Sequence, residues 1–175
     1  LTSENFTQNF FGFGNDTQNF DDTEGLDFNR VKTATRKIKV GTVKDGHYGS
    51  RIEITGGLEL IEVEETEDRF IAQAITAPDF FEMSKIFGNF DFTYSYSGFD
   101  NQVSPTRGMF FKVATGAKMN LENTERTFAY VNPSLEFYNA LTRDRKLVLN
   151  TKVQGQFNIG DAFEFYHGAS LGATN

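Results

Sequence analysis

Four consecutive segments between residues 86 and 159 alternate apolar and polar side chains with a period of two. Successive side chains of a β-strand point to opposite faces, so each segment would have one apolar, aromatic face and one polar face. Each segment spans about 10 residues or more, which is the length that a tilted strand needs to cross a bilayer. The pattern therefore predicts antiparallel strands of a transmembrane β-barrel with an apolar exterior and a polar lumen.

The alternation also predicts which residues share a face of the sheet. On the convex face, toward lipid, we expect Phe90, Phe92, Tyr94, Phe111, Val113, Val131, Leu135, Leu149, Val153 and Phe157. On the concave face we expect Asn89, Asp91, Lys112, Lys118, Glu136, Lys152 and Gln154. The charged members of this second set would face water and pair with one another.

The fold class that we predict is all-β, a six-stranded up-and-down meander that forms a segment of a transmembrane antiparallel β-barrel. The strands are expected at residues 28–43, 51–62, 86–98, 109–120, 127–140 and 147–160. A change of apolar parity between Thr35 and Ile38 predicts a β-bulge, and Asp45-Gly46 indicates a tight turn. Residues 1–27 have the composition of a loop, and the connection at 63–84 has room for a short helix.

Composition narrows the class of protein further. The net charge of −7 and the pI near 4.9 argue against nucleic-acid binding. No stretch approaches ~18 consecutive apolar residues, so no transmembrane helix is expected. Cysteine is absent, which excludes disulfides and thiolate metal sites. The 20 phenylalanines suit a membrane-facing band, and they equally suit the core of a β-sandwich.

No residue pattern indicates an enzyme, and we expect no cofactor. The two histidines, His47 and His167, lie far apart in the sequence and are interpreted as loop or turn residues. The glycines of FGFGND at 11–16 lack the strand-turn-helix context of a phosphate-binding loop. Carboxylates near residues 21–27 could supply oxygen ligands for calcium, but their spacing misses the EF-hand pattern. They are Asp21, Asp22, Glu24 and Asp27.

Two short phrases resemble one family of membrane proteins. The first is Pro105-Thr106-Arg107-Gly108, directly before a predicted strand. The second is FYHGASLG, which places Phe165, Tyr166, Gly168 and Gly172 after the last predicted strand. Barrels of the BamA-type superfamily, the bacterial surface antigen family, carry a Pro-Thr-x-Gly turn before a late strand. Their following long loop begins with a phrase like Phe-Tyr-x-Gly-x-x-x-Gly and continues to an Arg-Gly tip.

The resemblance implies a location and a function. Members of the family reside in the bacterial outer membrane and insert barrel proteins into it or move polypeptides across it. The implied partners are outer-membrane lipid, a client or passenger polypeptide, and periplasmic or lipoprotein partners. The turns at 44–50, 98–108 and 141–146 would be periplasmic. The segments 1–27, 63–84 and 121–126 would be extracellular, and 161–175 would start a long loop folded into the lumen.

Because six strands cannot close a barrel of this family, the resemblance implies that the barrel is incomplete. We therefore expect the chain to be a fragment of one outer-membrane barrel domain, with an extracellular loop at 1–27 and strands within 28–160. Any enzymatic domain would lie outside it.

Two alternatives stay open. FGFGND and IEVEETEDRF resemble phrases of Bacteroidetes members, some of which fuse the barrel to a phosphoesterase domain. The barrel could then be the anchor or export channel of a fused phosphoesterase or patatin-like lipase. The other alternative is a soluble β-sandwich binding module, whose core would need the apolar faces of two sheets to meet.

Overall fold

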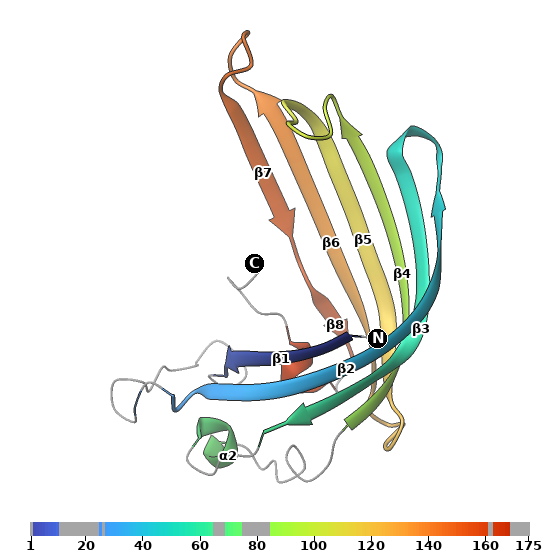
Figure 1. Cartoon of the computed structure of the whole chain (residues 1–175), viewed down its shortest axis with the longest axis vertical. Coiled ribbons are helices and arrows are strands. Elements are labelled where there is room, and N and C mark those ends of the chain that lie inside the picture. Colours follow the sequence, from blue (N-terminus) through green and yellow to red (C-terminus); the bar gives the residue numbers. More distant parts are fainter. Residues whose placement is uncertain are drawn as a thin grey trace. The chain divides into compact units, whose positions relative to one another are not determined.

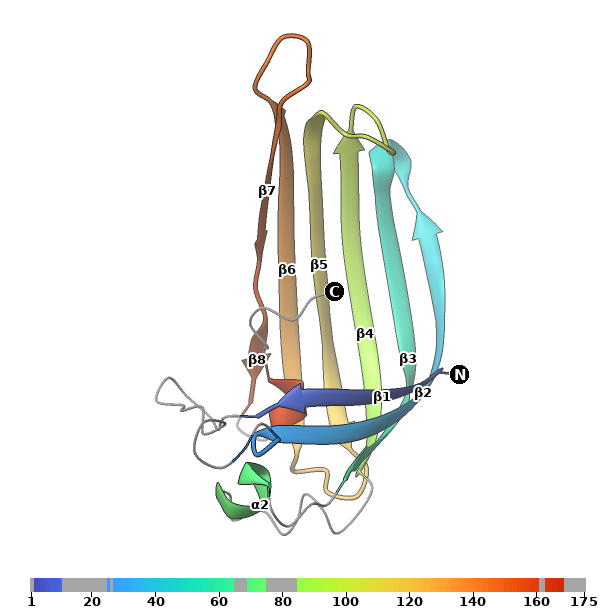
Figure 2. The same cartoon turned by 60° about the vertical axis from the view of Figure 1, so that its left-hand side comes forward.

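The strands of this protein form one antiparallel sheet, seen from two directions in Figures 1 and 2. The computed structural model describes residues 2–10, 25, 27–64, 69–74, 85–160 and 163–168. The sheet order follows the chain from β1 to β7, which is a meander that is not closed into a barrel. The predicted all-β antiparallel meander is thus confirmed. The strands are β1 (Thr2–Asn9), β2 (Arg30–Asp45), β3 (Ser50–Val63), β4 (Lys85–Phe99), β5 (Arg107–Asn120), β6 (Thr127–Ala140), β7 (Val148–Gln154) and β8 (Phe157–Ile159).

The meander has seven strands where we predicted six. The additional strand is β1, which lies in the segment 1–27 that we interpreted as a loop. It pairs with β2 from Thr2 opposite Lys37 to Asn9 opposite Arg30. An edge strand can form through backbone hydrogen bonds alone, so a polar strand carries little of the alternation by which strands are recognised. The helix expected within 63–84 is α2 (Phe70–Ala74).

The predicted strand at 147–160 is interrupted at Gly155 and Gln156, which separates β7 from β8. Both strands pair with β6, β7 with residues 134–140 and β8 with residues 129–131. Pro133 lies between these two stretches of β6. Its carbonyl oxygen accepts a hydrogen bond from Gly155 N at 3.0 Å, but proline has no N–H to return. The missing donor accounts for the break in the ladder.

The β-bulge predicted between Thr35 and Ile38 is wrong, because β2 and β3 keep one register on both sides of it, with hydrogen bonds from Glu64 N to Lys32 O and from Gly46 N to Ser50 O. The β1–β2 pairing advances one residue for one residue through Thr35, up to Lys37. The change of apolar parity that suggested a bulge is real, however. Val31 and Thr33 are buried, whereas Ile38 and Val40, of the opposite parity, are exposed.

The chain divides into two compact units. Unit 1 comprises residues 1–39, 57–88 and 120–123. Its described core is small and aromatic, and α2 contributes to it through Ile71 and Phe70. The Phe70 ring lies 6.1 Å from Phe10 and 5.9 Å from Phe28, centroid to centroid. The buried apolar residues are Phe10, Phe28, Val31, Ile61, Ile71 and Phe87.

Unit 2 comprises residues 40–56, 89–119 and 124–175. It holds β6 to β8, β5 up to Met119, and parts of β2, β3 and β4. The β2–β3 hairpin is closed by the 3-10 turn His47–Gly49. Tyr48 and Gly49 have the positive φ values of this turn, so the reversal falls just after the predicted Asp45-Gly46. The described residues of both sequence motifs lie in unit 2.

Candidate functional site: a two-faced sheet with a motif segment at each end

The apolar residues of unit 2 gather on one face of the sheet, as the alternation predicts. Residues that are directly opposite in antiparallel strands project to the same face. The register places Phe111 opposite Leu135, and Leu135 opposite Val153. Tyr94 of β4 joins this face, since its ring lies 6.4 Å from the Phe111 ring. The other apolar pairs are Met109–Phe137, Val113–Pro133, Thr115–Val131, Ala117–Ala129, Val131–Phe157 and Ala129–Ile159.

This apolar face is open. Val153 is 63% exposed, Phe157 60% and Phe90 56%. Leu149 and Ile159 are exposed as well. The described strands form a single sheet, so no second sheet among them packs on this face. Large apolar side chains exposed side by side over several strands mark a surface that meets something other than water.

The opposite face of unit 2 is polar. The register places Glu136 opposite Lys152, and Ser134 opposite both Lys112 and Gln154. The Glu136 carboxylate also accepts a hydrogen bond of 2.8 Å from the Asn150 side chain. The predicted separation into two faces is therefore confirmed for β5 to β8. That the apolar face is the convex one stays a prediction.

A hydrogen-bonded row crosses the polar face through Asp91. Tyr130 donates its hydroxyl to Oδ1 of Asp91, and Thr55 donates its hydroxyl to Oδ2 at 3.2 Å. Gly116 lies opposite Tyr130, between β4 and β6. A Cβ at Gly116 would come within 2.8 Å of the tyrosine hydroxyl and 2.4 Å of the Phe90 carbonyl oxygen. Only glycine lets the phenol lie across the middle strand, and this arrangement was missed from the sequence.

Asp100 organises the first motif, the turn between β4 and β5. Its carboxylate accepts hydrogen bonds from the Thr106 hydroxyl at 2.6 Å, and from the backbone N–H groups of Thr106 and Arg107 at 2.9 Å each. The Arg145 guanidinium adds a contact of 3.2 Å from the next turn. The Thr106 hydroxyl, then the two amides and Arg145, hold the pKa of this carboxyl well below its usual range.

The rest of the turn is fixed by its side chains and by one glycine. Asn101 accepts hydrogen bonds from the N–H groups of Val103 and Ser104 at 2.9 and 3.1 Å. Gly108 has φ of 130°, and a Cβ there would approach the Gly98 carbonyl oxygen to 2.1 Å. The glycine of the motif is thus required by both conformation and space. In the sequence, the signal for these Asx-type bonds is the Asp-Asn pair ahead of the motif.

The described part of the second motif, Phe165 to Gly168, belongs to the segment 163–168, which packs on the polar face. The His167 carbonyl oxygen accepts hydrogen bonds from the Gln156 and Asn158 side chains at 2.8 and 2.9 Å. The His167 ring lies 4.8 Å from the Phe128 ring, and the buried Glu164 forms an ion pair with the half-buried Arg126. These contacts hold the 3-10 turn Phe165–His167 against β6 and β8.

The structure does not bring the two motifs together. Arg107 lies opposite Asn139 at one end of β6, whereas the second motif contacts Phe128 near the other end. Phe165 is buried, and Tyr166 and Gly168 are half-buried. Gly172 lies outside the described residues. Within the molecule the motif residues therefore serve the ends of the sheet, not one shared centre.

The described residues hold little that suggests a metal site or a helical anchor. No group of three or more His, Cys, Asp or Glu side chains among them is placed to hold a metal ion. Asp27, of the acidic segment, pairs with Arg30 at 2.6 Å, while Asp21, Asp22 and Glu24 lie outside the described ranges. No helix in the described part of the chain has both the length and the apolar character to cross a membrane.

Comparisons with protein-family models, with curated protein sequences and with solved structures find no match for this chain. The family resemblance therefore depends on the two motifs and on the alternation of the strands, and it stays a prediction.

Proposed function

We propose that this chain is a wall segment of a BamA-type barrel in the bacterial outer membrane. The whole barrel would insert outer-membrane proteins or translocate polypeptides. The observation that carries the proposal is the open apolar face of unit 2, opposite a polar face. In water such a face is unfavourable, whereas in a bilayer it is the face that a barrel turns toward lipid.

The length of the apolar face supports its proposed position in a bilayer. On β5 it extends from Met109 to Met119. Ten steps of about 3.4 Å give roughly 34 Å along the strand, and a tilt of about 40° reduces this to roughly 26 Å along the membrane normal. The apolar band of outer-membrane barrels is about 25 Å tall, so the two lengths agree.

The polar face and the second motif support the proposal that this side of the sheet lines the lumen of a barrel. Lys152, Glu136 and Gln154 share a face that water could solvate, and residues 163–168 pack against the same face. A loop that returns into the lumen is what the resemblance implies for this phrase. This chain would then form part of the barrel wall. The strands that admit a client by edge pairing would belong to other parts of the barrel.

Single cysteines can test lipid contact, because these 175 residues contain none and any cysteine elsewhere in the full-length protein can be replaced by serine. Val113→Cys and Ala114→Cys would place one environment-sensitive fluorophore on neighbouring residues of opposite faces in the full-length protein, reconstituted in vesicles. We expect a blue-shifted emission and quenching by nitroxide lipids at position 113, and neither at 114. The same response at both positions would contradict a lipid-facing wall.

Activity needs a second measurement. The full-length protein in phosphatidylcholine vesicles should accelerate the folding of a urea-denatured small outer-membrane barrel, followed by its heat-modifiable gel shift. If lipid contact is found but neither folding nor transport of a client is accelerated, the chain is better explained as an anchor of a fused domain.

A further inference from the structure

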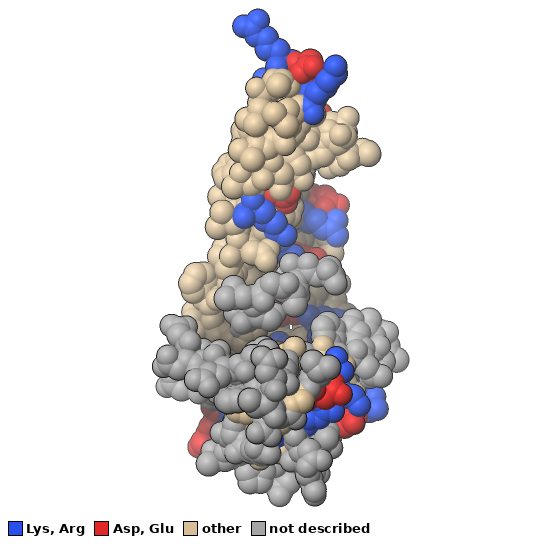
Figure 3. All heavy atoms as spheres, turned by 90° about the vertical axis from the view of Figure 1, so that its left-hand side faces the viewer, with Lys and Arg blue, Asp and Glu red and all other residues tan. Residues whose placement is uncertain are grey.

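Basic side chains gather at the end of unit 2 that carries its three short turns. Within residues 44–51, 99–108 and 141–147 there are six Lys or Arg and three Asp, a net charge of +3 in a chain of net charge −7. Asp45 and Asp100 each lie beside an arginine, Arg51 at 3.3 Å and Arg145 at 3.2 Å. Figure 3 shows Lys and Arg side chains on either side of an acidic one at the tip of the β6–β7 hairpin, above a surface with few charges.

Apolar side chains are exposed at the same three turns. Tyr48 is 91% exposed in the first and Val103 95% exposed in the second. Leu141 and Leu147 are exposed on either side of the charged residues of the third. Basic residues interleaved with exposed apolar ones are typical of the boundary between lipid headgroups and hydrocarbon.

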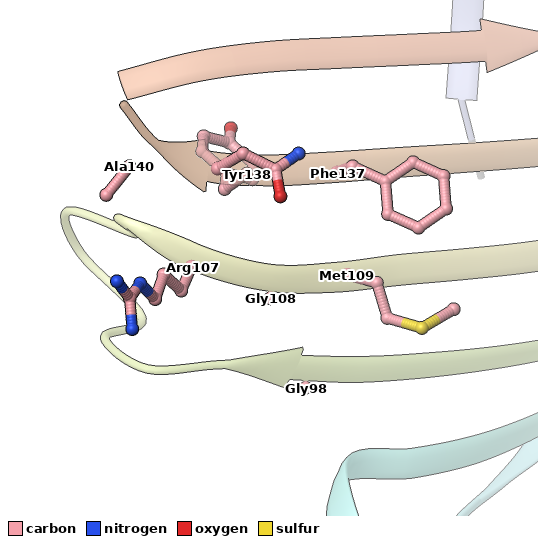
Figure 4. A pocket seen from close by; sticks show the side chains of 8 residues that line it. Gly98, Arg107, Gly108, Met109, Phe137, Tyr138 and Ala140 are labelled. Carbon is pink, nitrogen blue, oxygen red and sulfur yellow. The ribbon is translucent and has the colours of Figure 1, made fainter. Parts of the chain in front are cut away.

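A shallow depression of about 520 Å³ opens on the sheet between the second and third turns. Met109 and Phe137 lie opposite each other in it, and Arg107 lies opposite Asn139 two residues closer to the turn. Figure 4 shows this order, with the Arg107 guanidinium beyond the apolar pair and Gly98 beside Met109 on the neighbouring strand. The exposed Arg107 therefore stands at the turn side of an apolar floor.

We infer that this depression binds an anionic phospholipid, with Arg107 at the phosphate and the first part of an acyl chain on Met109 and Phe137. The inference depends on the proposed function, because it needs the apolar face to lie in a bilayer. A guanidinium presents paired N–H donors that match phosphate oxygens. The net charge of the turns selects an anion, and the apolar floor selects a lipid over a free phosphate. Arg107 occupies the variable position of the turn motif, so it would set lipid preference without changing the turn.

These 175 residues contain no tryptophan, so a single introduced tryptophan reports on the site once any tryptophan elsewhere in the full-length protein is replaced by phenylalanine. Asn139→Trp would place the only tryptophan of the chain beside Arg107, at an exposed position of the same face. The full-length variant is reconstituted in mixed vesicles in which either phosphatidylglycerol or phosphatidylcholine carries bromine near the headgroup end of its acyl chains. Brominated lipid quenches tryptophan on contact, so the two titrations compare the affinity of the site for the two lipids.

We expect phosphatidylglycerol to be preferred by about fivefold, the ratio that corresponds to roughly 1 kcal/mol for one basic residue at an anionic surface. Arg107→Gln in the same background should reduce the ratio to near one. Lys112→Gln, which removes the same charge from the polar face of the same strand, should leave it unchanged. The heat-modifiable gel shift checks that each variant folds.

The outcomes separate the two proposals. Equal quenching by both lipids in the Asn139→Trp protein overturns the phospholipid site while lipid contact stands. An equal loss of preference in Arg107→Gln and Lys112→Gln also overturns it, because the effect would then be one of net charge. Absence of quenching by either lipid contradicts the membrane position of this face, and with it the proposed function.

Discussion

A charge placed on the apolar face should destabilise the protein according to its depth, and Val113→Arg is the sharpest case. Val113 pairs with Pro133 on the apolar face, one residue from the middle of the Met109–Met119 stretch. At about 3.4 Å per residue and a tilt of about 40°, it would lie roughly 3 Å from the midplane of the bilayer. Met119 is five residues from the middle, which places it roughly 13 Å away, at the edge of the apolar band.

The expected magnitudes follow from these depths. Arginine costs about 2–4 kcal/mol at the midplane of a barrel wall and about 0–1 kcal/mol near the interface. Val113→Arg should therefore reduce the stability of the folded protein in the bilayer by roughly 3 kcal/mol, and Met119→Arg by roughly 0.5 kcal/mol. The difference of about 2.5 kcal/mol corresponds to roughly 70-fold in the folding equilibrium.

The assay is folding of the full-length protein into lipid vesicles, read from the heat-modifiable gel shift across a urea series. Gln154→Arg is the control, because Gln154 lies on the polar face opposite Ser134 and water can solvate a new charge there. We expect Val113→Arg to destabilise the protein most and Met119→Arg less, and Gln154→Arg to stay close to the parent. Equal effects at Val113 and Gln154 would refute the reasoning, since neither face would then meet hydrocarbon.

Two further predictions concern the turn between β4 and β5. Gly108→Ala should destabilise the protein by about 1–3 kcal/mol, because the new Cβ meets the Gly98 carbonyl at a positive φ; a urea midpoint equal to that of the parent would contradict this. Because the pKa of Asp100 is lower in the folded turn than in the unfolded chain, its contribution to stability should be complete above about pH 4 and be lost as the pH falls further. Hydrogen exchange of the Thr106 and Arg107 amides would follow this loss, and a carboxyl that titrates at its ordinary pKa would argue against it.

The alternation of residues in β4 to β8 was enough to predict the sheet, its meander order and its two faces. Each pair such as Phe111 with Leu135 follows once the strands are antiparallel and their apolar faces coincide. The predicted strand ends were also close to the observed ones, because Pro, Gly, Asp and Asn mark the turns. Alternation identifies long two-faced strands well, since every second residue repeats the same signal.

The features that escaped prediction arise from contacts between distant residues. The interruption between β7 and β8 comes from Pro133 of the neighbouring strand, which has no N–H for Gly155. The place of Gly116 is explained by the Tyr130 hydroxyl that crosses it to reach Asp91. Neither relation can be derived until the register between strands is known, because each depends on which residue lies opposite which.

The change of apolar parity along β2 has a consequence for the proposed membrane position. Val31 and Thr33 are buried in unit 1, while Ile38 and Val40, of the other parity, are exposed. A bulge would have explained the change by moving the backbone, but the pairing with β1 is regular through Lys37. The backbone of β2 is therefore continuous. The environment that suits its side chains changes along the strand. Near Val31 the odd residues join a small core, whereas just beyond Lys37 the apolar residues are the even ones, Ile38 and Val40, and both are exposed. In a barrel wall, such a change of apolar parity is expected where a strand leaves the hydrocarbon and continues into water. We therefore predict that β2 crosses the boundary of the hydrocarbon near residues 34–37.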